Sequence, residues 1–236
     1  MLDNITFILL NTSHPGNIGA AARAMKNMRL SQLALVKPKH YPSAEATARS
    51  SGADDLLTSA TVYPDISSAI AKHQIIFAAS ARERRIPWPT LELREAAELA
   101  IKNSQQSIAF IFGHERSGLS NEELDVSHYL VKIPANPEYH SLNLAAAVQV
   151  FAYELMMAAK TEKKLAPPQE LVNLGDMENF YQYLETLMIE IGFLDPKNPK
   201  YLMRRLRRIF NRSQLENMEL NILRGLLSQL HRHNKK

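Results

Sequence analysis

Short apolar runs alternate with helix-like segments along the first two thirds of the chain. The apolar runs, which are typical of buried strands, lie at residues 5–10, 32–37, 74–80, 108–113 and 129–134. Between them, residues 18–28 and 91–102 read as helices, and Ser120 is placed to cap a further helix that begins at Asn121. Strands that alternate with helices predict an α/β domain with a mostly parallel sheet, covering residues 1–160.

One segment of this domain, residues 133–155, joins two opposite patterns. Its first part is rich in proline and other turn formers, whereas residues 142–155 are alanine-rich and almost entirely apolar. The second part predicts a helix that is buried nearly all round, with Ser141 as its N-cap. A buried core helix and one wall of a ligand site are equally consistent with this local pattern. A membrane span is not expected, because Gln149 and Glu154 interrupt a run that is shorter than roughly 20 residues.

The pattern changes after residue 160. Residues 161–175 are polar, contain a Pro-Pro pair and lack a clear period, which predicts a linker. Residues 176–236 carry apolar side chains at three- and four-residue intervals in three blocks, the first of which ends at Gly192. This last region is therefore predicted to be a small bundle of three helices.

Composition narrows the possible functions. The chain of 236 residues has no cysteine, which excludes disulfides, cysteine zinc sites and a thiol nucleophile. Its histidines are dispersed and no H-E-x-x-H pattern occurs, so no metal is expected. No basic segment precedes the first apolar run, so no signal peptide is expected, and a cytoplasmic location fits. The formal net charge of +4 points mildly to nucleic acid as a partner.

The positive charge is concentrated in the middle of the helical region. Residues 196–215 include many arginines and lysines but no acidic residue. A solvated face normally mixes both signs, whereas an unmixed row of guanidinium groups suits phosphates, so we favour nucleic-acid binding over a solvated face. A second basic group follows the third predicted strand, at the end of the sheet where α/β proteins bind ligands. The candidate RNA-binding residues are Arg82, Arg84, Arg85, Arg204, Arg205, Arg208 and Arg212.

Two loops near predicted strand ends could carry chemistry. Residues 16–19 (G-N-I-G) precede a helix but lack the spacing of a P-loop or a dinucleotide fingerprint. Arg23, one turn into that helix, is either a salt-bridge partner or a group directed at the mouth of the loop. In residues 113–118 two glycines bracket opposite charges, so the backbone can approach a ligand while Glu115 accepts hydrogen bonds.

Three segments in order give the chain a family resemblance. The segments are N-I-G-A-A-A-R (17–23), F-G-H-E-R-S-G-L (112–119) and I-P-A-N-P-E-Y-H-S-L-N-L-A-A-A-V (133–148). They resemble the motifs of the SPOUT methyltransferases, S-adenosylmethionine-dependent RNA 2′-O-ribose methylases, in the TrmH/TrmJ branch. The helical region resembles the extension of the bacterial tRNA (cytidine/uridine-2′-O-)-methyltransferases in that branch.

The resemblance implies a fold, a partner and a reaction. The α/β domain is expected to end in a trefoil knot, and two copies are expected to form a homodimer through their knot helices. The implied reaction is 2′-O-methylation of the cytidine or uridine at position 32 in the tRNA anticodon loop. The alternative is another tRNA site or a ribosomal RNA site.

The resemblance also implies roles for individual residues. Arg23 matches the family arginine, and because a guanidinium stays protonated we expect it to orient the phosphate and the 2′-oxygen rather than to take a proton. It would act on cofactor held mainly by the partner subunit. Asn17 is expected to shape its loop, and Ser141 and Asn143 to orient substrate or cofactor, so that these three complete the catalytic set with Arg23. The residues expected to bind S-adenosylmethionine are Ala79, Ser80, Ala81, Gly113, Glu115, Leu119, Ile133, Ser141, Leu142 and Asn143.

Two other classes of function compete with this interpretation. One is an RNA-binding module with a vestigial cofactor fold, which the presence of Arg23, Glu115, Ser141 and Asn143 disfavours. The other is a nucleotide-dependent dehydrogenase, which the missing glycine fingerprint disfavours. The base preference, the set of tRNAs and the placement of the helical region stay open at this level.

Overall fold

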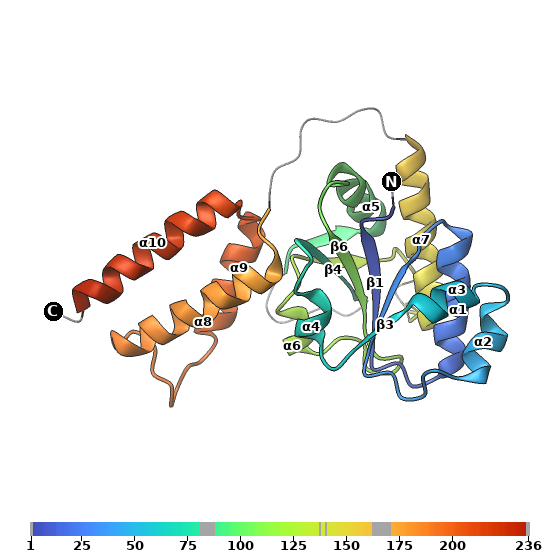
Figure 1. Cartoon of the computed structure of the whole chain (residues 1–236), viewed down its shortest axis with the longest axis horizontal. Helices are drawn as coiled ribbons and strands as arrows, with labels where there is room; N and C mark the ends of the chain where they lie inside the picture. Colours follow the sequence, from blue (N-terminus) through green and yellow to red (C-terminus); the bar gives the residue numbers. More distant parts are fainter. Residues whose placement is uncertain (1, 81–87, 137, 140, 162–170, 235–236) are drawn as a thin grey trace.

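A parallel sheet made of the predicted apolar runs forms the centre of the larger part of the molecule (Figure 1). The computed structural model describes residues 2–80, 88–136, 138–139, 141–161 and 171–234. The seven strands follow the order β3-β2-β1-β6-β4-β7-β5, and all neighbours pair in parallel. They are β1 (Ile5–Leu10), β2 (Gln32–Val36), β3 (Thr61–Tyr63), β4 (Ile75–Ala79), β5 (Thr90–Glu92), β6 (Ile108–Phe112) and β7 (Tyr129–Lys132).

The five predicted strands are confirmed, and two short strands were not predicted. β3 and β5 have three residues each and form the two edges of the sheet, where their side chains are largely exposed. Edge strands of this length bury too little apolar surface to leave a pattern in the sequence. The predicted α/β domain with a parallel sheet is confirmed, and the trefoil knot remains an expectation from the resemblance.

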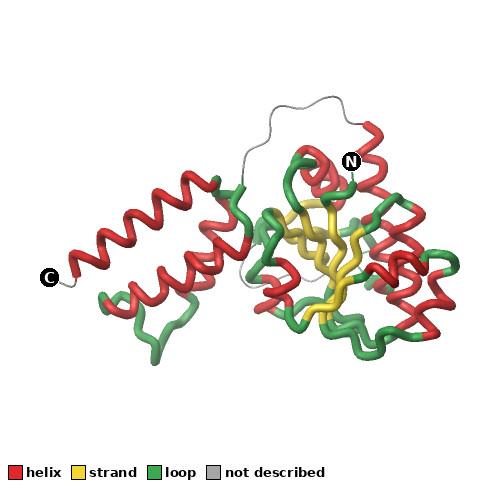
Figure 2. Tube along the Cα trace, in the orientation of Figure 1, coloured by secondary structure: helices red, strands yellow, loops and turns green. Residues whose placement is uncertain are grey.

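Helices cover both faces of the sheet (Figure 2). One face is covered by α1 (Pro15–Asn27), α5 (Leu93–Lys102) and α7 (Leu144–Thr161), with α7 packed against both others. The shorter helices α2 (Ala44–Ser50) and α3 (Asp54–Ser59) pack outside α1. The opposite face carries α4 (Ile66–Ile70), α6 (Asn121–Leu124) and the start of the helical region.

Aromatic rings fix α7 on the sheet. Phe7, Phe110 and Phe77 occupy one register across three neighbouring strands, with ring centroids 5.7 Å and 4.7 Å apart. Phe151 of α7 meets Phe110 and Phe112 edge-on, at 5.8 Å and 5.0 Å. Such offset and edge-on pairs add to the burial that holds the helix in place.

α7 differs from the prediction in two respects. Only one of its faces is buried, through Val148, Phe151 and Leu155, whereas Tyr153 is 46% and Met157 is 37% exposed. Its N-cap is Asn143, not Ser141, because the Oδ1 of Asn143 accepts the N–H groups of Ala145 at 2.9 Å and Ala146 at 3.4 Å.

The helical region consists of the three predicted helices, α8 (Leu174–Glu190), α9 (Leu202–Ser213) and α10 (Asn217–Asn234). Gly192, with φ +73°, follows α8 as predicted. The predicted linker is too long at its far end: Leu171, Val172 and Leu174 are buried, and Val172 and Leu174 share an apolar cluster with the second face of the sheet. No helix in the described ranges is both long and apolar enough to cross a membrane.

Candidate active site

The carboxyl ends of β4, β6 and β7 open into a cavity of about 240 Å³, at the edge of the sheet where parallel α/β folds bind ligands. Its walls come from the segment after β4, the loop after β6, and the segment that leads from β7 into α7. The lining residues are Ala79, Ser80, Phe112, Gly113, His114, Glu115, Arg116, Gly118, Leu119, Val131, Ile133, Ser141, Leu142, Leu144, Ala147 and Phe151.

The structure brings the predicted cofactor residues together at this cavity. All of them line it except Asn143, which caps α7, and Ala81, which lies outside the described residues. Sequence reasoning missed Leu144, Ala147 and Phe151, which also line it. These three recur at helical spacing on one face of α7, so the period of that helix could have identified them.

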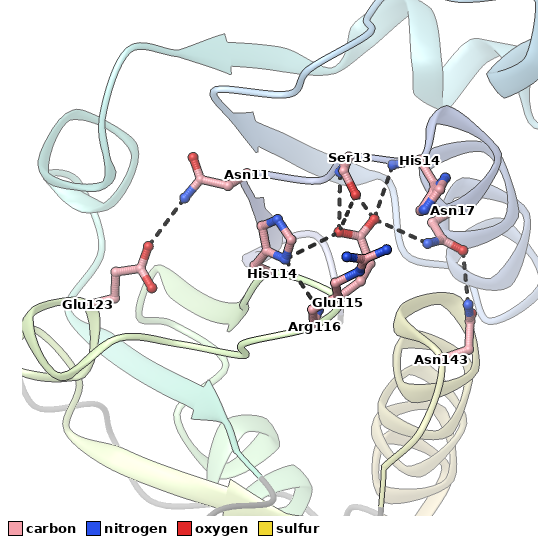
Figure 3. Close-up of polar contacts among 9 residues, drawn as sticks. All are labelled: Asn11, Ser13, His14, Asn17, His114, Glu115, Arg116, Glu123 and Asn143. Carbon is pink, nitrogen blue, oxygen red and sulfur yellow. Dashed lines mark hydrogen bonds and ion pairs between the residues drawn. The ribbon is translucent and has the colours of Figure 1, made fainter.

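Glu115 ties the loop after β6 to the loop that precedes α1 (Figure 3). Its carboxylate accepts hydrogen bonds from the backbone N–H of Ser13 at 3.1 and 3.2 Å and from the Ser13 hydroxyl at 3.0 Å. It also accepts from the backbone N–H of His14 at 3.2 Å and from the Asn17 amide at 3.2 Å. Ser13 was not predicted, because nothing local distinguishes it within a cluster of turn-forming residues.

Asn17 and Asn143 extend this connection to the third loop. The Nδ2 of Asn143 donates to the Oδ1 of Asn17 at 3.0 Å, while the Nδ2 of Asn17 donates to Glu115. One chain of hydrogen bonds therefore joins the loops before α1, after β6 and before α7. Asn17 and Asn143 act in this structure as links between the walls of the site.

The hydrogen bonds control the charge of Glu115. Burial alone would raise the pKa of its carboxyl, but donors from the backbone and from Asn17 outweigh burial and lower the pKa from 4.5 to about 2. The group is therefore ionised at neutral pH and is a poor general base or acid. A negative charge beside the start of α1 is also favourable with respect to the helix dipole.

The loop after β6 is pinched between two glycines. A Cβ on Gly113 would lie 2.3 Å from the carbonyl carbon of Gly118, and Gly118 has φ +65°. The N–H of Gly118 donates to the carbonyl of His114 at 2.8 Å. Only glycine at both positions allows this closed loop, whose backbone groups border the cavity.

Arg23 is exposed on α1 and is not among the residues that line the cavity of its own chain. Arg82, Arg84 and Arg85 lie outside the described residues. No group of three or more histidine, aspartate or glutamate side chains that could hold a metal occurs among the residues with described positions.

The arginines of α9 fall into two groups. Arg204 donates to Asp125 and Arg207 donates to Glu178, so both are directed into the protein. Arg205 and Arg212 are exposed, Arg208 is partly exposed, and none of the three contacts a carboxylate among the described residues. Arg204, which the sequence groups with the candidate RNA-binding residues Arg208 and Arg212, is instead paired with Asp125 of the α/β domain.

Known proteins resemble this chain along its whole length. The SpoU rRNA Methylase family model matches residues 4–153, and the model of the C-terminal domain of tRNA methyltransferase TrmJ matches residues 175–236. The tRNA (cytidine/uridine/adenosine-2′-O-)-methyltransferase TrmJ of Pseudomonas aeruginosa (strain UCBPP-PA14) is 48% identical over 97% of this chain and 94% of its own.

Two more comparisons agree. The tRNA (cytidine/uridine-2′-O-)-methyltransferase TrmJ of Photorhabdus laumondii is 46% identical over 100% of both chains. The crystal structure of TrmJ from Z. mobilis ZM4 superposes with a TM-score of 0.86 at 31% identity, covering 96% of this chain and 98% of that one. The resemblance inferred from the three motifs is thereby confirmed. The chain belongs to the SpoU methylase family, within the group of the TrmJ tRNA methyltransferases.

Proposed function

We propose that this protein transfers the methyl group of S-adenosylmethionine to the 2′-hydroxyl of the cytidine or uridine at position 32 in the tRNA anticodon loop. The observation that carries the proposal is the cavity, two walls of which, the loop after β6 and the segment before α7, are joined through Glu115, Asn17 and Asn143. Relatives named as tRNA 2′-O-methyltransferases over the full chain length support the same reaction and substrate.

The residues around the cavity fit this cofactor. Apolar side chains such as Ile133 and Leu144 suit the adenine ring, and the exposed backbone of the glycine-bracketed loop suits the hydroxyls of its ribose. Glu115 is occupied by the loop before α1, so it shapes the pocket rather than reacting. The bound cofactor supplies an activated methyl group on a sulfonium, which is a good leaving group.

Arg23 is proposed to act in the active site of a partner subunit. It lies away from the cavity of its own chain, and the outer face of α7 offers an apolar surface for a second copy. Ala146, Val150, Tyr153 and Met157 recur there at four- and three-residue intervals and are exposed or partly exposed. A homodimer formed through α7 would place the α1 helix of one protomer beside the cavity of the other.

The chemistry assigned to these residues is positioning. The Arg23 guanidinium donates hydrogen bonds to the phosphate and the 2′-oxygen and holds that oxygen in line with the methyl carbon. A bound cofactor would supply the methyl group, with the O–C bond replacing the C–S bond, and the hydroxyl proton would pass to solvent. A carboxyl whose pKa is about 2 does not serve as the base. We assign tRNA binding to Arg205, Arg208 and Arg212 of α9, together with Arg82, Arg84 and Arg85. We also propose that the protein acts in the cytoplasm.

Mapping 2′-O-methyl groups on tRNA transcripts after incubation with protein and cofactor tests the function. Transcripts with cytidine, uridine or adenosine at position 32 should be compared, because the name of the P. aeruginosa relative includes adenosine. A methyl group at another position, or on ribosomal RNA alone, would support the alternative substrate. Absence of any heat on titration with S-adenosylmethionine would support an RNA-binding module without catalysis.

Arg23→Ala tests the catalytic assignment. We expect calorimetry to give unchanged affinity for S-adenosylmethionine, because Arg23 does not line the cavity, and methylation to fall at least about a hundredfold when positioning is lost. Equal turnover by the variant would remove Arg23 from the mechanism.

A further inference from the structure

Helix α9 contacts the rest of the protein through polar as well as apolar side chains. Arg204, Arg207 and Asn211, spaced three and four residues apart, are directed inward, and Asn211 is only 4% exposed. Ile209 is 49% exposed instead. The apolar side chains Met203 and Phe210 pack against the apolar cluster on this side, and the Phe210 ring meets the Phe180 ring edge-on at 5.1 Å.

The innermost contact joins α9 to the end of α6. The Nε of Arg204 lies 2.8 Å from one carboxylate oxygen of Asp125, and its Nη2 donates to the other at 2.9 Å. The side chains of Arg204 and Asp125 are 28% and 16% exposed. Asn211 adds a longer bond to the Asp125 carbonyl at 3.4 Å and accepts from the Tyr181 hydroxyl at 2.6 Å. A bidentate guanidinium–carboxylate pair fixes orientation as well as distance.

Asp125 is separated from the cofactor cavity by one turn of helix. Leu119 lines the cavity, and Ser120 caps α6 by accepting the N–H of Glu123 at 3.2 Å. Glu123 in turn accepts from Asn11 at 3.4 Å, at the end of β1 and just before the loop held by Glu115. A movement of α6 therefore reaches the loop after β6, which is one wall of the cavity, and the end of β1, just before the loop that Glu115 holds.

The packing around this contact leaves a second cavity. A cavity of about 300 Å³ lies between α4, α8 and α9, bordered by Glu178, Tyr181, Arg207 and Asn211. A bidentate contact fixes orientation more narrowly than apolar packing does. The Asp125–Arg204 pair is such a contact between α9 and the end of α6.

We propose that Asp125 is a positioning residue that, through Arg204, sets the arginine helix α9 relative to the cofactor loop. tRNA bound on α9 and cofactor bound in the cavity then strengthen each other, because both favour the same placement of α6. The inference rests on the proposed function, since it requires tRNA on α9 and S-adenosylmethionine in the cavity.

Two substitutions separate positioning from simple charge attraction. Asp125→Asn removes a negative charge next to an arginine helix, so charge attraction alone would make tRNA bind more tightly. The positioning role predicts weaker binding. Arg204→Lys keeps the positive charge but cannot form both bonds, so a direct phosphate contact would survive whereas the positioning contact would not.

The experiment measures the affinity for S-adenosylhomocysteine with and without a saturating unmodified tRNA transcript. In the unaltered protein we expect tRNA to tighten this binding about tenfold, a common size for coupled sites. Asp125→Asn and Arg204→Lys should lose that factor while keeping the affinity without tRNA within about twofold. The double variant should lose no more of the tRNA-dependent gain in affinity than either single variant does, because both substitutions remove the same contact. Glu98→Gln, at an exposed carboxylate on α5, is the matched control and should keep the factor.

Several outcomes would overturn the proposal. These are an unaltered protein in which tRNA does not affect cofactor affinity, an Asp125→Asn protein that keeps the full factor, and an Arg204→Lys protein that behaves like the unaltered one. If Asp125→Asn fails to fold by thermal unfolding, the result for Arg204→Lys decides. A protein that binds cofactor but no tRNA at all would refute the proposed function instead.

Discussion

Replacing Glu115 with glutamine should loosen the whole site, because one carboxylate holds the loop before α1 against the loop after β6. The folded protein lowers the pKa of this carboxyl from 4.5 to about 2. At roughly 1.4 kcal/mol per pH unit, the hydrogen bonds to the ionised form contribute at most about 3 kcal/mol to the free energy of unfolding at pH 7. The 12% of the side chain that is exposed makes the real figure smaller.

Glutamine keeps the shape of the side chain but loses the charge and turns an amide donor toward N–H groups that also donate. We therefore expect Glu115→Gln to lower the free energy of unfolding by about 2 kcal/mol at pH 7, or the melting temperature by about 4–8 °C. Its affinity for S-adenosylmethionine should fall as well, because the loop it anchors lines the cavity.

The dependence on pH distinguishes this cause from a general packing defect. A carboxyl with a lowered folded-state pKa stabilises the protein above its unfolded-state pKa, and the effect is lost as pH falls toward the folded-state pKa. The difference between Glu115→Gln and the unaltered protein, measured by urea unfolding at pH 7, 5, 4 and 3, should be constant down to about pH 5 and shrink below it. A difference that stays the same at pH 3, or one no larger than that of Glu98→Gln at pH 7, would refute this account of Glu115.

Three further substitutions test other parts of the structure. Tyr153→Asp places a charge on the outer face of α7, so light scattering should show a folded monomer, and methylation should be abolished if Arg23 acts across subunits. A monomer that still methylates tRNA would contradict this. Tyr153 is chosen because it is exposed, whereas a charge at Val148, which is fully buried, would disrupt the core of the protomer itself. Asn143→Ala removes the cap of α7 and the link to Asn17, and should lower the free energy of unfolding in urea by about 1–2 kcal/mol. Ser141→Ala should lower it much less. Equal decreases for the two variants would show that Asn143 is not the cap. His128 is buried and accepts a hydrogen bond from the N–H of Ile76, and burial lowers its pKa to about 4. Below pH 6.5, therefore, this histidine is protonated in the unfolded chain but stays neutral in the folded chain. His128→Asn should therefore remove about 2 kcal/mol of the loss of stability between pH 7 and 5, and an unchanged loss would contradict the buried neutral state.

The parts of the fold that follow from local pattern were predictable from the sequence. The long strands are continuous apolar runs because both faces of the sheet are covered, and α8 ends shortly before Gly192 because glycine accepts the left-handed conformation found there. β3 and β5 were missed because three-residue edge strands leave no such signal. α1 begins at Pro15, earlier than expected, since proline at the first helical position needs no hydrogen-bond partner.

Several features of the candidate site could not be predicted from local sequence pattern. Ser141 and Asn143 are both suitable N-cap residues and lie two positions apart. Local pattern cannot tell which of them caps α7, whereas the structure shows that Asn143 does. Arg204 reads as part of a basic row because its partner, Asp125, lies 79 positions away. The resemblance to a family identified the loops that form the site. The contacts between Ser13, Asn17 and Glu115 could not be predicted in this way, because they depend on the arrangement of the strands.

The position of α7 has a consequence for synthesis on the ribosome. β1 and α1 are made first, yet β1 pairs with β6 about a hundred residues later, and the surface between α1 and α5 is covered only when residues 144–161 arrive. Until then Phe110 and Phe112 lack Phe151, and Asn17 lacks Asn143. A nascent chain released before this helix would expose a wide apolar groove and have no closed cavity, so it would be a natural target for chaperones and proteases. The last helix of the α/β domain is therefore also the element whose arrival closes this face of the sheet.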